Sequence, residues 1–409
     1  NQHTAALANE KPPHRHPNLR QNPSGRLLLS HLTQKLDCCD KFVKFPTAKV
    51  FMMKNEVQDL YIDYIISSFG AVTATNLSEV LDGAISHDKV TRMLAQPPQT
   101  SKDLWLRVKP LIRAIESDDG VLIIDDSITE KPSTDESPLI CWHYDHSKDR
   151  TVKGVNFISA LYHSNDVSLP VGVHQVMKSD YQTDPKTGKR KRKALFTKNH
   201  YCRSLLAQAV QNSLRFRYIL MDIWFASAEN IMFVHHDLNK HCIVPLKPNR
   251  KVALSLEDKK QGKYVRVDTL PMEENQVREI WLESVDFPLA LVKQVFTNDD
   301  GSTGILYLVS SDTSLSYERI TTIYEKRWNV ECYHKSLKQN AALEKSPTKT
   351  RTTQTNHFFA SLYAYIRLES LKISTKMNHF ALKNKLYVKA VQHAFAELQK
   401  LQNPAECVT

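Results

Sequence analysis

Two short apolar segments, each running into an aspartate, constrain the fold of this chain most strongly. The first is VLIIDD at residues 121–126, and the second is YILMD at residues 218–222. A continuous apolar run of this length is typical of a strand buried on both faces, in a sheet that helices cover on both sides. A buried, unpaired carboxylate is costly. The acids therefore indicate either functional positions or strands that end in solvated turns.

Other strand and helix patterns divide the chain into regions. Residues 153–164 and 167–177 read as strands joined by the turn Asn165-Asp166, and residues 304–312 read as a later strand of the same sheet. The expected fold class is α/β, a mixed sheet flanked by helices. The expected regions are a flexible basic arm (1–25), a helical N-terminal region (26–118), the sheet domain (119–248 and 302–345), a β-rich insertion (249–301) and a helical C-terminal region (346–409).

Residues 76–96 have the pattern of a helix-turn-helix, with Gly83 at the turn and Ser86 as the N-cap of the second helix. The expected inward residues are Leu77, Val80 and Leu81 in the first helix and Val90, Met93 and Leu94 in the second. Lys89 and Arg92 then point outward, on a helix that could enter the major groove of DNA. A helical hairpin that only packs on its neighbours has the same pattern, so both interpretations stay open.

Residues 315–340 predict one long helix, with Thr313 and Ser314 as plausible N-caps. Tyr324, Arg327, Glu331 and Lys338 fall within an arc of roughly 60° on this helix. One carboxylate is therefore flanked along a single face by a phenol, a guanidinium and an ammonium group. An ordinary ion pair on a solvated helix surface would look the same.

This spacing, Y-x-x-R-x-x-x-E-x-x-x-x-x-x-K, resembles the Y-R-E-K motif of bacterial insertion-sequence transposases of the DDE class. The resemblance implies a ribonuclease H-like sheet in which Glu331 is the third catalytic carboxylate. It also implies that Tyr324, Arg327 and Lys338, with Lys335 nearby, hold DNA phosphates. The other two catalytic acids would be the strand-end aspartates, Asp222 and one of the pair at residues 125 and 126.

Asp125 and Asp126 compete for the first catalytic position. Successive residues of a strand point to opposite faces, so only one of the two can face the site. The family pattern of an apolar strand, a variable residue and then Asp followed by Ser or Thr favours Asp126, which precedes Ser127. Strand register alone also permits Asp125, which would match the way Asp222 directly follows its apolar run.

The three expected carboxylates, Asp126, Asp222 and Glu331, can together hold a pair of divalent ions. Oxygen ligands suit Mg²⁺, and Mn²⁺ is expected to substitute for it. The resemblance implies that the metal site hydrolyses phosphodiester bonds and then transfers strands, with no separate Ser or Cys nucleophile.

Charge also favours a nucleic acid partner. The 409 residues include 55 Lys and Arg against 44 Asp and Glu, a net charge of +11. A basic run at residues 189–193 lies in an expected polar loop (179–200), and its members Lys189, Arg190 and Arg192 are candidate phosphate contacts. No apolar stretch reaches 18 residues, so we expect no membrane span.

The resulting hypothesis is a transposase that binds the terminal inverted repeats of its element, cuts the DNA ends and joins the 3′-OH ends to target DNA. A homodimer on paired ends is expected from the family, as is a cytoplasmic location at the bacterial nucleoid, and we expect no small-molecule substrate. A metal-dependent nuclease or resolvase of the same fold, or a non-catalytic repurposed DNA-binding protein, remains an alternative.

Overall fold

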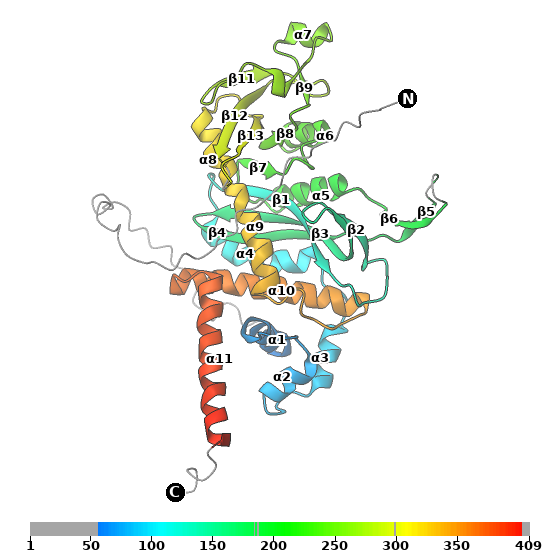
Figure 1. The fold of residues 1–409 in the computed structure, drawn as a ribbon, viewed down its shortest axis with the longest axis vertical. Helices are drawn as coiled ribbons and strands as arrows, with labels where there is room; N and C mark the ends of the chain where they lie inside the picture. Colours follow the sequence, from blue (N-terminus) through cyan, green and yellow to red (C-terminus); the bar gives the residue numbers. More distant parts are fainter. Residues whose placement is uncertain (1–55, 184, 186–187, 298–299, 403–409) are drawn as a thin grey trace, which may run out of the picture.

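The computed structural model describes residues 56–183, 185, 188–297 and 300–402. The expected basic arm (1–25) lies outside the described residues. In the described part, nine strands form one mixed sheet in the order β11-β12-β13-β8-β7-β1-β3-β2, and β4 also pairs with β3 (Figure 1). The strands of this sheet are β1 (Val121–Glu130), β2 (Cys141–Asp145), β3 (Arg150–Ser164), β4 (Val167–Gln175), β7 (Tyr218–Met221), β8 (His241–Leu246), β11 (Val277–Ile280), β12 (Leu289–Thr297) and β13 (Thr303–Ser310).

The middle of the sheet has the topology that the sequence predicts. β1, β3 and β4 form an antiparallel meander, and β7 and then β8 add to the other side of β1 in parallel. The ribonuclease H-like fold class is thereby confirmed. Gly154 allows β3 to lie against β1, because a Cβ at this position would be 2.1 Å from the carbonyl oxygen of Thr129.

Helices cover both faces of the sheet, as the two apolar runs require. On one face, α4 (Ser101–Ile115) and α5 (Lys198–Gln211) pack on β4, where Gly172 faces Ser101 and Leu205. On the other face, α9 (Asn329–Gln339) packs on β1, and α10 (Arg351–Thr375) reaches β3 through the ring contact of Phe358 with Phe157. β1 and β7 are thus buried between two helical layers.

The N-terminal helices dock on α10. They are α1 (Glu56–Ser67), α2 (Ala74–Val80) and α3 (His87–Leu94), and Ser86 is at the N-cap position of α3 as expected. The inward residues include Leu77, Val90 and Leu94, but Val80 is 66% exposed. The prediction for Val80 is wrong because α2 is only two turns long and ends at this residue, whose side chain faces solvent.

Two further segments differ from the sequence prediction. The expected polar loop at 179–200 contains a β-hairpin, β5 (Asp180–Thr183) paired with β6 (Arg190–Lys193), which projects from the sheet domain (Figure 1). In the expected insertion, β11 and β12 continue the main sheet, while β9 (Lys251–Val252) and β10 (Val265–Arg266) pair separately beside α7 (Leu256–Lys260). α6 (Ala228–Met232), followed by a π-helical turn (Phe233–Asp237), connects β7 to β8.

The long helix predicted at 315–340 is interrupted. α8 (Tyr317–Glu325) and α9 are joined by a 3₁₀ turn at Lys326–Trp328. The N-cap is Ser316, whose side chain accepts a hydrogen bond from the backbone N–H of Arg319. The prediction of Ser314 or Thr313 as the cap is wrong, and Ser314 is instead bound through its backbone N–H and its hydroxyl to the Asp312 carboxylate.

The last helix, α11 (His379–Gln402), extends away from the body of the molecule (Figure 1). Leu382 packs in the core, but many apolar residues of α11 are exposed, and they are Phe380, Tyr387, Val388, Val391, Phe395, Leu398 and Leu401. None of the helices that the structure describes combines the length and the apolar character that a membrane crossing requires.

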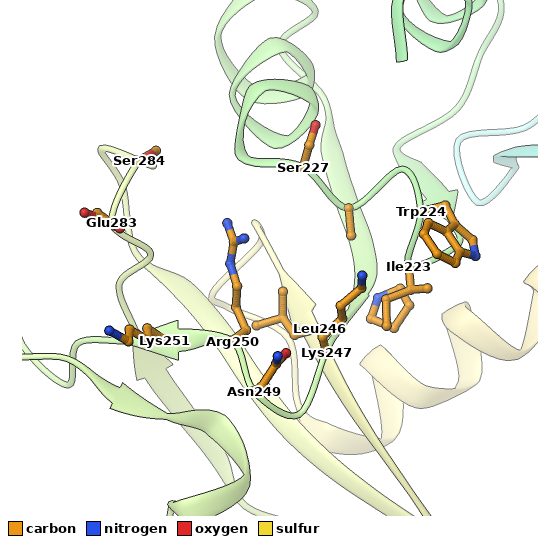
Figure 2. A pocket seen from close by; sticks show the side chains of 12 residues that line it. Ile223, Trp224, Ser227, Leu246, Lys247, Asn249, Arg250, Lys251, Glu283 and Ser284 are labelled. Atoms are coloured by element: carbon orange, nitrogen blue, oxygen red, sulfur yellow. The ribbon is translucent and has the colours of Figure 1, made fainter. Parts of the chain in front are cut away.

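A cavity of about 590 Å³ opens beside the carboxyl end of β7 (Figure 2). Its wall includes Trp224 and three basic residues, Lys247, Arg250 and Lys251. The Trp224 ring is 51% exposed, is stacked with the His146 ring at 4.2 Å between centroids, and has the Lys247 ammonium 4.8 Å from its centre.

Candidate active site

The two inner parallel strands bring two aspartates together. β1 pairs with β7 so that Ile123 lies opposite Leu220 and Ile124 opposite Met221. Asp125 and Asp222 directly follow this last pair, and continuing the register gives them a shared face of the sheet, in line with the electrostatic interaction between the two carboxylates. The apolar runs therefore place these two carboxylates side by side at the carboxyl ends of their strands.

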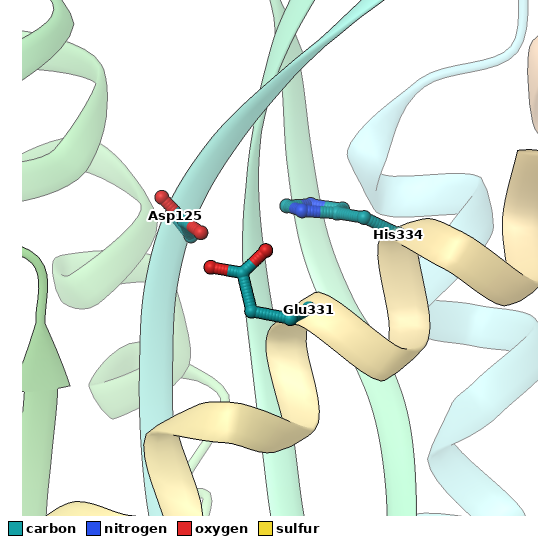
Figure 3. Close-up of side chains that lie close together, drawn as sticks. All are labelled: Asp125, Glu331 and His334. Carbon is teal, nitrogen blue, oxygen red and sulfur yellow. The ribbon is translucent and has the colours of Figure 1, made fainter. Parts of the chain in front are cut away.

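α9 supplies the third carboxylate from the helical layer on the same face. Ligand atoms of Asp125, Glu331 and His334 all lie within 4.8 Å of one another (Figure 3). The phenol of Tyr333, on the same helix, lies 3.3 Å from the Ser159 hydroxyl on β3, and Ser159 is the partner of Asp125 across the sheet. This contact helps to fix α9 over the end of β1.

Arg327 lies between the strand end and the helix. Its Nη1 is 4.0 Å from Asp125 Oδ2 and 3.5 Å from Glu331 Oε1. Its guanidinium also lies 5.9 Å from the centre of the buried Tyr324 ring. A fixed positive charge therefore partly balances the carboxylates.

Burial and mutual repulsion shape the electrostatics of this cluster. Burial raises the pKa of Asp125 well above its usual range, and the charges of Glu331, Asp126 and Asp222 raise it further, while Arg327 opposes the shift. Burial, helped by the positive charges of Lys338 and Arg327, lowers the pKa of His334 to about 3, so its imidazole is neutral at pH 7. A group of acids that resists full ionisation is a common arrangement at sites that bind cations.

Asp126 points to the other face of the sheet. Its Oδ2 accepts hydrogen bonds from Lys198 Nζ at 2.6 Å and from Asn156 Nδ2 at 2.9 Å. The alternation of side chains along β1 explains the difference between the neighbours. The structure thus has Asp125, the alternative that strand register permits, beside Glu331, while Asp126 lies beside Lys198.

The donor set fits a divalent metal ion. Asp125 and Glu331 offer carboxylate oxygens, which Mg²⁺ and Mn²⁺ prefer, and His334 adds a buried neutral nitrogen. Asp222, at the end of the neighbouring strand, is a further candidate oxygen ligand. The Nε2 atom of His334 is buried and has no hydrogen-bond partner in the described residues. The E-x-x-H spacing of Glu331 and His334 could have revealed the second residue from the sequence, because positions three apart share a helix face.

The remaining basic candidate residues on the helices differ in their exposure. Lys338 is half-buried on α9, 3.9 Å from Glu344, while Lys335 is exposed and lies 5.3 Å from the Phe380 ring centre. Lys89 and Arg92 are exposed on α3, as predicted.

The hairpin residues differ in their surroundings. Lys189 and Arg190 are exposed, and the Arg190 guanidinium lies 4.1 Å from the Tyr181 ring centre. Arg192 is half-buried and donates a hydrogen bond from Nε to Glu136 at 2.8 Å. A neutralised arginine is less available for a phosphate, so Arg190 is the more accessible cation of this hairpin pair.

Two family models match this chain. A family model described as DDE superfamily endonuclease matches residues 53–266, and a second, described as an archaeal transposase ISC1217, matches residues 189–379. Among curated proteins, none matches this chain. A solved structure, the Drosophila P element transposase strand transfer complex, is 13% identical with a TM-score of 0.24, over 54% of this chain and 49% of that chain.

Proposed function

The chain belongs to the DDE superfamily of endonucleases, and on this basis we propose that it is a transposase that cuts DNA at the ends of its element and joins the 3′-OH ends to target DNA. The observation that carries the proposal is the cluster of Asp125 and Glu331 around Arg327, with Asp222 at the end of the neighbouring strand and close enough for its charge to act on Asp125. In this proposal Asp125, and not Asp126, is the first catalytic carboxylate.

The three carboxylates would hold divalent metal ions, most simply a pair of Mg²⁺ ions with Mn²⁺ as a substitute. Bound there, the metal would activate a water or a 3′-hydroxyl and stabilise the leaving oxygen of the scissile phosphate. The raised pKa of Asp125 supports this assignment, because a site whose acids repel one another gains most from a cation.

Arg327 has a second role in the proposal, because a guanidinium can hold a phosphate through two parallel hydrogen bonds. It is 17% exposed and already lies beside Asp125 and Glu331, so it can orient a phosphodiester at the carboxylates without a large rearrangement. Tyr324, buried beside it, would limit the motion of the guanidinium. Lys338, seven residues after Glu331 on the same helix face, would contact the DNA backbone, together with the exposed Lys335.

Other exposed basic groups would hold the DNA further from the cut. Lys89 and Arg92 on α3 would contact the terminal repeats, and Lys189 and Arg190 on the β5–β6 hairpin would contact the flanking backbone. The exposed apolar residues of α11 support a homodimer on paired ends. Because the substrate is chromosomal DNA, the proposed place of action is the cytoplasm, at the nucleoid.

The test is cleavage of linear DNA that carries the element's own ends, with Mg²⁺, with Mn²⁺ and with EDTA. Asp125→Asn, Asp222→Asn and Glu331→Gln are expected to abolish cleavage while end binding persists. Asp126→Asn is the matched control, because it changes the neighbouring residue on the other face of β1 and should still cut. Cleavage by Asp125→Asn together with loss of cleavage in Asp126→Asn would reverse the assignment, and cleavage in EDTA would end it.

A further inference from the structure

His334 lies one helical turn after Glu331 and takes part in the same cluster. Its side chain is 6% exposed, and its imidazole extends from α9 toward the space beside Asp125 and Glu331 (Figure 3). Ligand atoms of the three residues lie within 4.8 Å of one another. Two atoms that bind one ion at about 2.1 Å each are at most roughly 4 Å apart, so a small rotation of the side chains closes the set.

Packing alone gives an incomplete account of His334. The ring contacts Phe157 edge-on at 5.7 Å and Tyr333 at 5.1 Å between centroids, so an aromatic residue suits this position. However, Nε2 is buried and has no hydrogen-bond partner among the described residues, and a buried polar atom left without a partner carries an energetic cost. A phenylalanine would pack in the same space without this cost. A nitrogen in this place is therefore best explained by a ligand that the described protein atoms do not supply.

We propose that His334 is a nitrogen ligand of the divalent ion that Asp125 and Glu331 hold, and that it makes this position prefer Mn²⁺ to Mg²⁺. The inference rests on the proposed function, since it concerns the same metal site. A neutral imidazole is a good ligand for transition metals, whereas Mg²⁺ favours sites made of oxygen. A site with one nitrogen among carboxylates thus gains affinity for Mn²⁺ without a matching gain for Mg²⁺.

The experiment measures metal binding directly, without DNA and without activity. Mn²⁺ is added to the purified full chain, and pulsed electron paramagnetic resonance is used to detect the coupling of the ion to a ¹⁴N nucleus. The wild-type protein is expected to show this coupling, and His334→Phe is expected to lose it. By calorimetry, His334→Phe should weaken Mn²⁺ binding at least about tenfold and Mg²⁺ binding less than about threefold, in line with the cost of altering a metal site.

Two further variants control for misfolding of His334→Phe and for ¹⁴N coupling that comes from another histidine. His334→Gln, which keeps a polar side chain, should lose the ¹⁴N signal in the same way if the phenylalanine variant does not fold. His163→Phe removes a histidine that is similarly buried on β3 but is hydrogen-bonded to Ser168, and it should keep the signal.

The outcomes separate this inference from the proposed function. Mn²⁺ that binds with no ¹⁴N coupling, or coupling that persists in His334→Phe, overturns the role of His334 and leaves the carboxylate site intact. Equal weakening of Mn²⁺ and Mg²⁺ overturns the selectivity. A wild-type protein that binds neither ion, or binding unchanged by Asp125→Asn, overturns both proposals.

Discussion

Replacing Arg327 by methionine tests whether this residue stabilises the carboxylate cluster when no metal is added. Methionine keeps much of the length and apolar volume of the side chain but removes its charge. Nη1 of Arg327 lies 4.0 Å from Asp125 and 3.5 Å from Glu331. At an effective dielectric constant of about 20, these two attractions amount to about 4 and about 5 kcal/mol before any cost is subtracted.

Several terms reduce this gross figure. The Glu331 side chain is 36% exposed, so solvent screens its share, and burying the guanidinium carries a desolvation cost. Protonation of Asp125 recovers part of the loss in the variant, because its pKa is already raised. We expect Arg327→Met to lower the free energy of unfolding by about 2–4 kcal/mol in EDTA, close to the cost of removing one partner of a buried ion pair.

A divalent ion should reduce the difference in free energy of unfolding between Arg327→Met and the wild type. The ion replaces the missing positive charge, and it binds more tightly once the arginine no longer repels it, so metal stabilises the variant more than the wild type. Urea unfolding with EDTA and with saturating Mn²⁺ measures both effects. Arg319→Met, an exposed position on α8, is the control and should change stability by less than about 0.5 kcal/mol. Unchanged stability of Arg327→Met in EDTA, or a difference that Mn²⁺ leaves as large, refutes the reasoning.

Four further predictions can be checked by unfolding measurements and by DNA binding. Asp126→Asn should lower stability by about 1–3 kcal/mol at pH 7, because it weakens a charge-assisted hydrogen-bond network. Asp125→Asn should not lower it. The folded-state pKa of Asp125 is raised, so its contribution to stability is present below the unfolded-state pKa and is lost as pH rises through the folded-state pKa. The free energy of unfolding of Asp125→Asn should therefore fall less steeply with rising pH than that of the wild type. Equal slopes for the two proteins would contradict this. Burial raises the pKa of Glu369, but His379 and Lys372 lower it overall. Glu369→Gln should therefore lower the free energy of unfolding by about 3 kcal/mol at neutral pH, and by progressively less as pH falls through the folded-state pKa. A loss that does not depend on pH would exclude the ion pairs as its source. Replacing Lys89 and Arg92 together by alanine should reduce the slope of log K against log salt for end binding by about 1.8, and an unchanged slope would show that α3 does not contact phosphates.

The sequence was sufficient for the central sheet because its evidence is local. Apolar runs that end in acids predict buried parallel strands, and the spacing of Tyr324, Arg327 and Glu331 predicts a shared helix face. Both patterns survive in the structure, although the 3₁₀ turn at Lys326–Trp328 divides the helix. A 3₁₀ turn of three residues changes the spacing of apolar residues too little to be located from the sequence.

The choice between Asp125 and Asp126 needed information that the sequence holds only indirectly. The pairing of β1 with β7 decides which aspartate shares a face with Asp222, and this pairing joins segments far apart in the chain. The alternation of side chains along β1 puts the two aspartates on opposite faces, but it does not say which face α9 will cover. His334 was missed for a related reason, since a histidine on the inner face of a helix looks like a core residue until its neighbours are known.

The cluster joins the end of an early strand to a helix near the far end of the described chain, and this separation has a consequence for biosynthesis. During translation, both aspartate-bearing strands leave the ribosome well before α9 is made. A nascent chain can pair β1 with β7 but has neither Glu331 nor Arg327 beside them. The high contact order of this arrangement therefore makes docking of α9 a late folding step. A polypeptide that ends before Asn329 would leave the carboxylates of Asp125 and Asp222 without the helix that covers them.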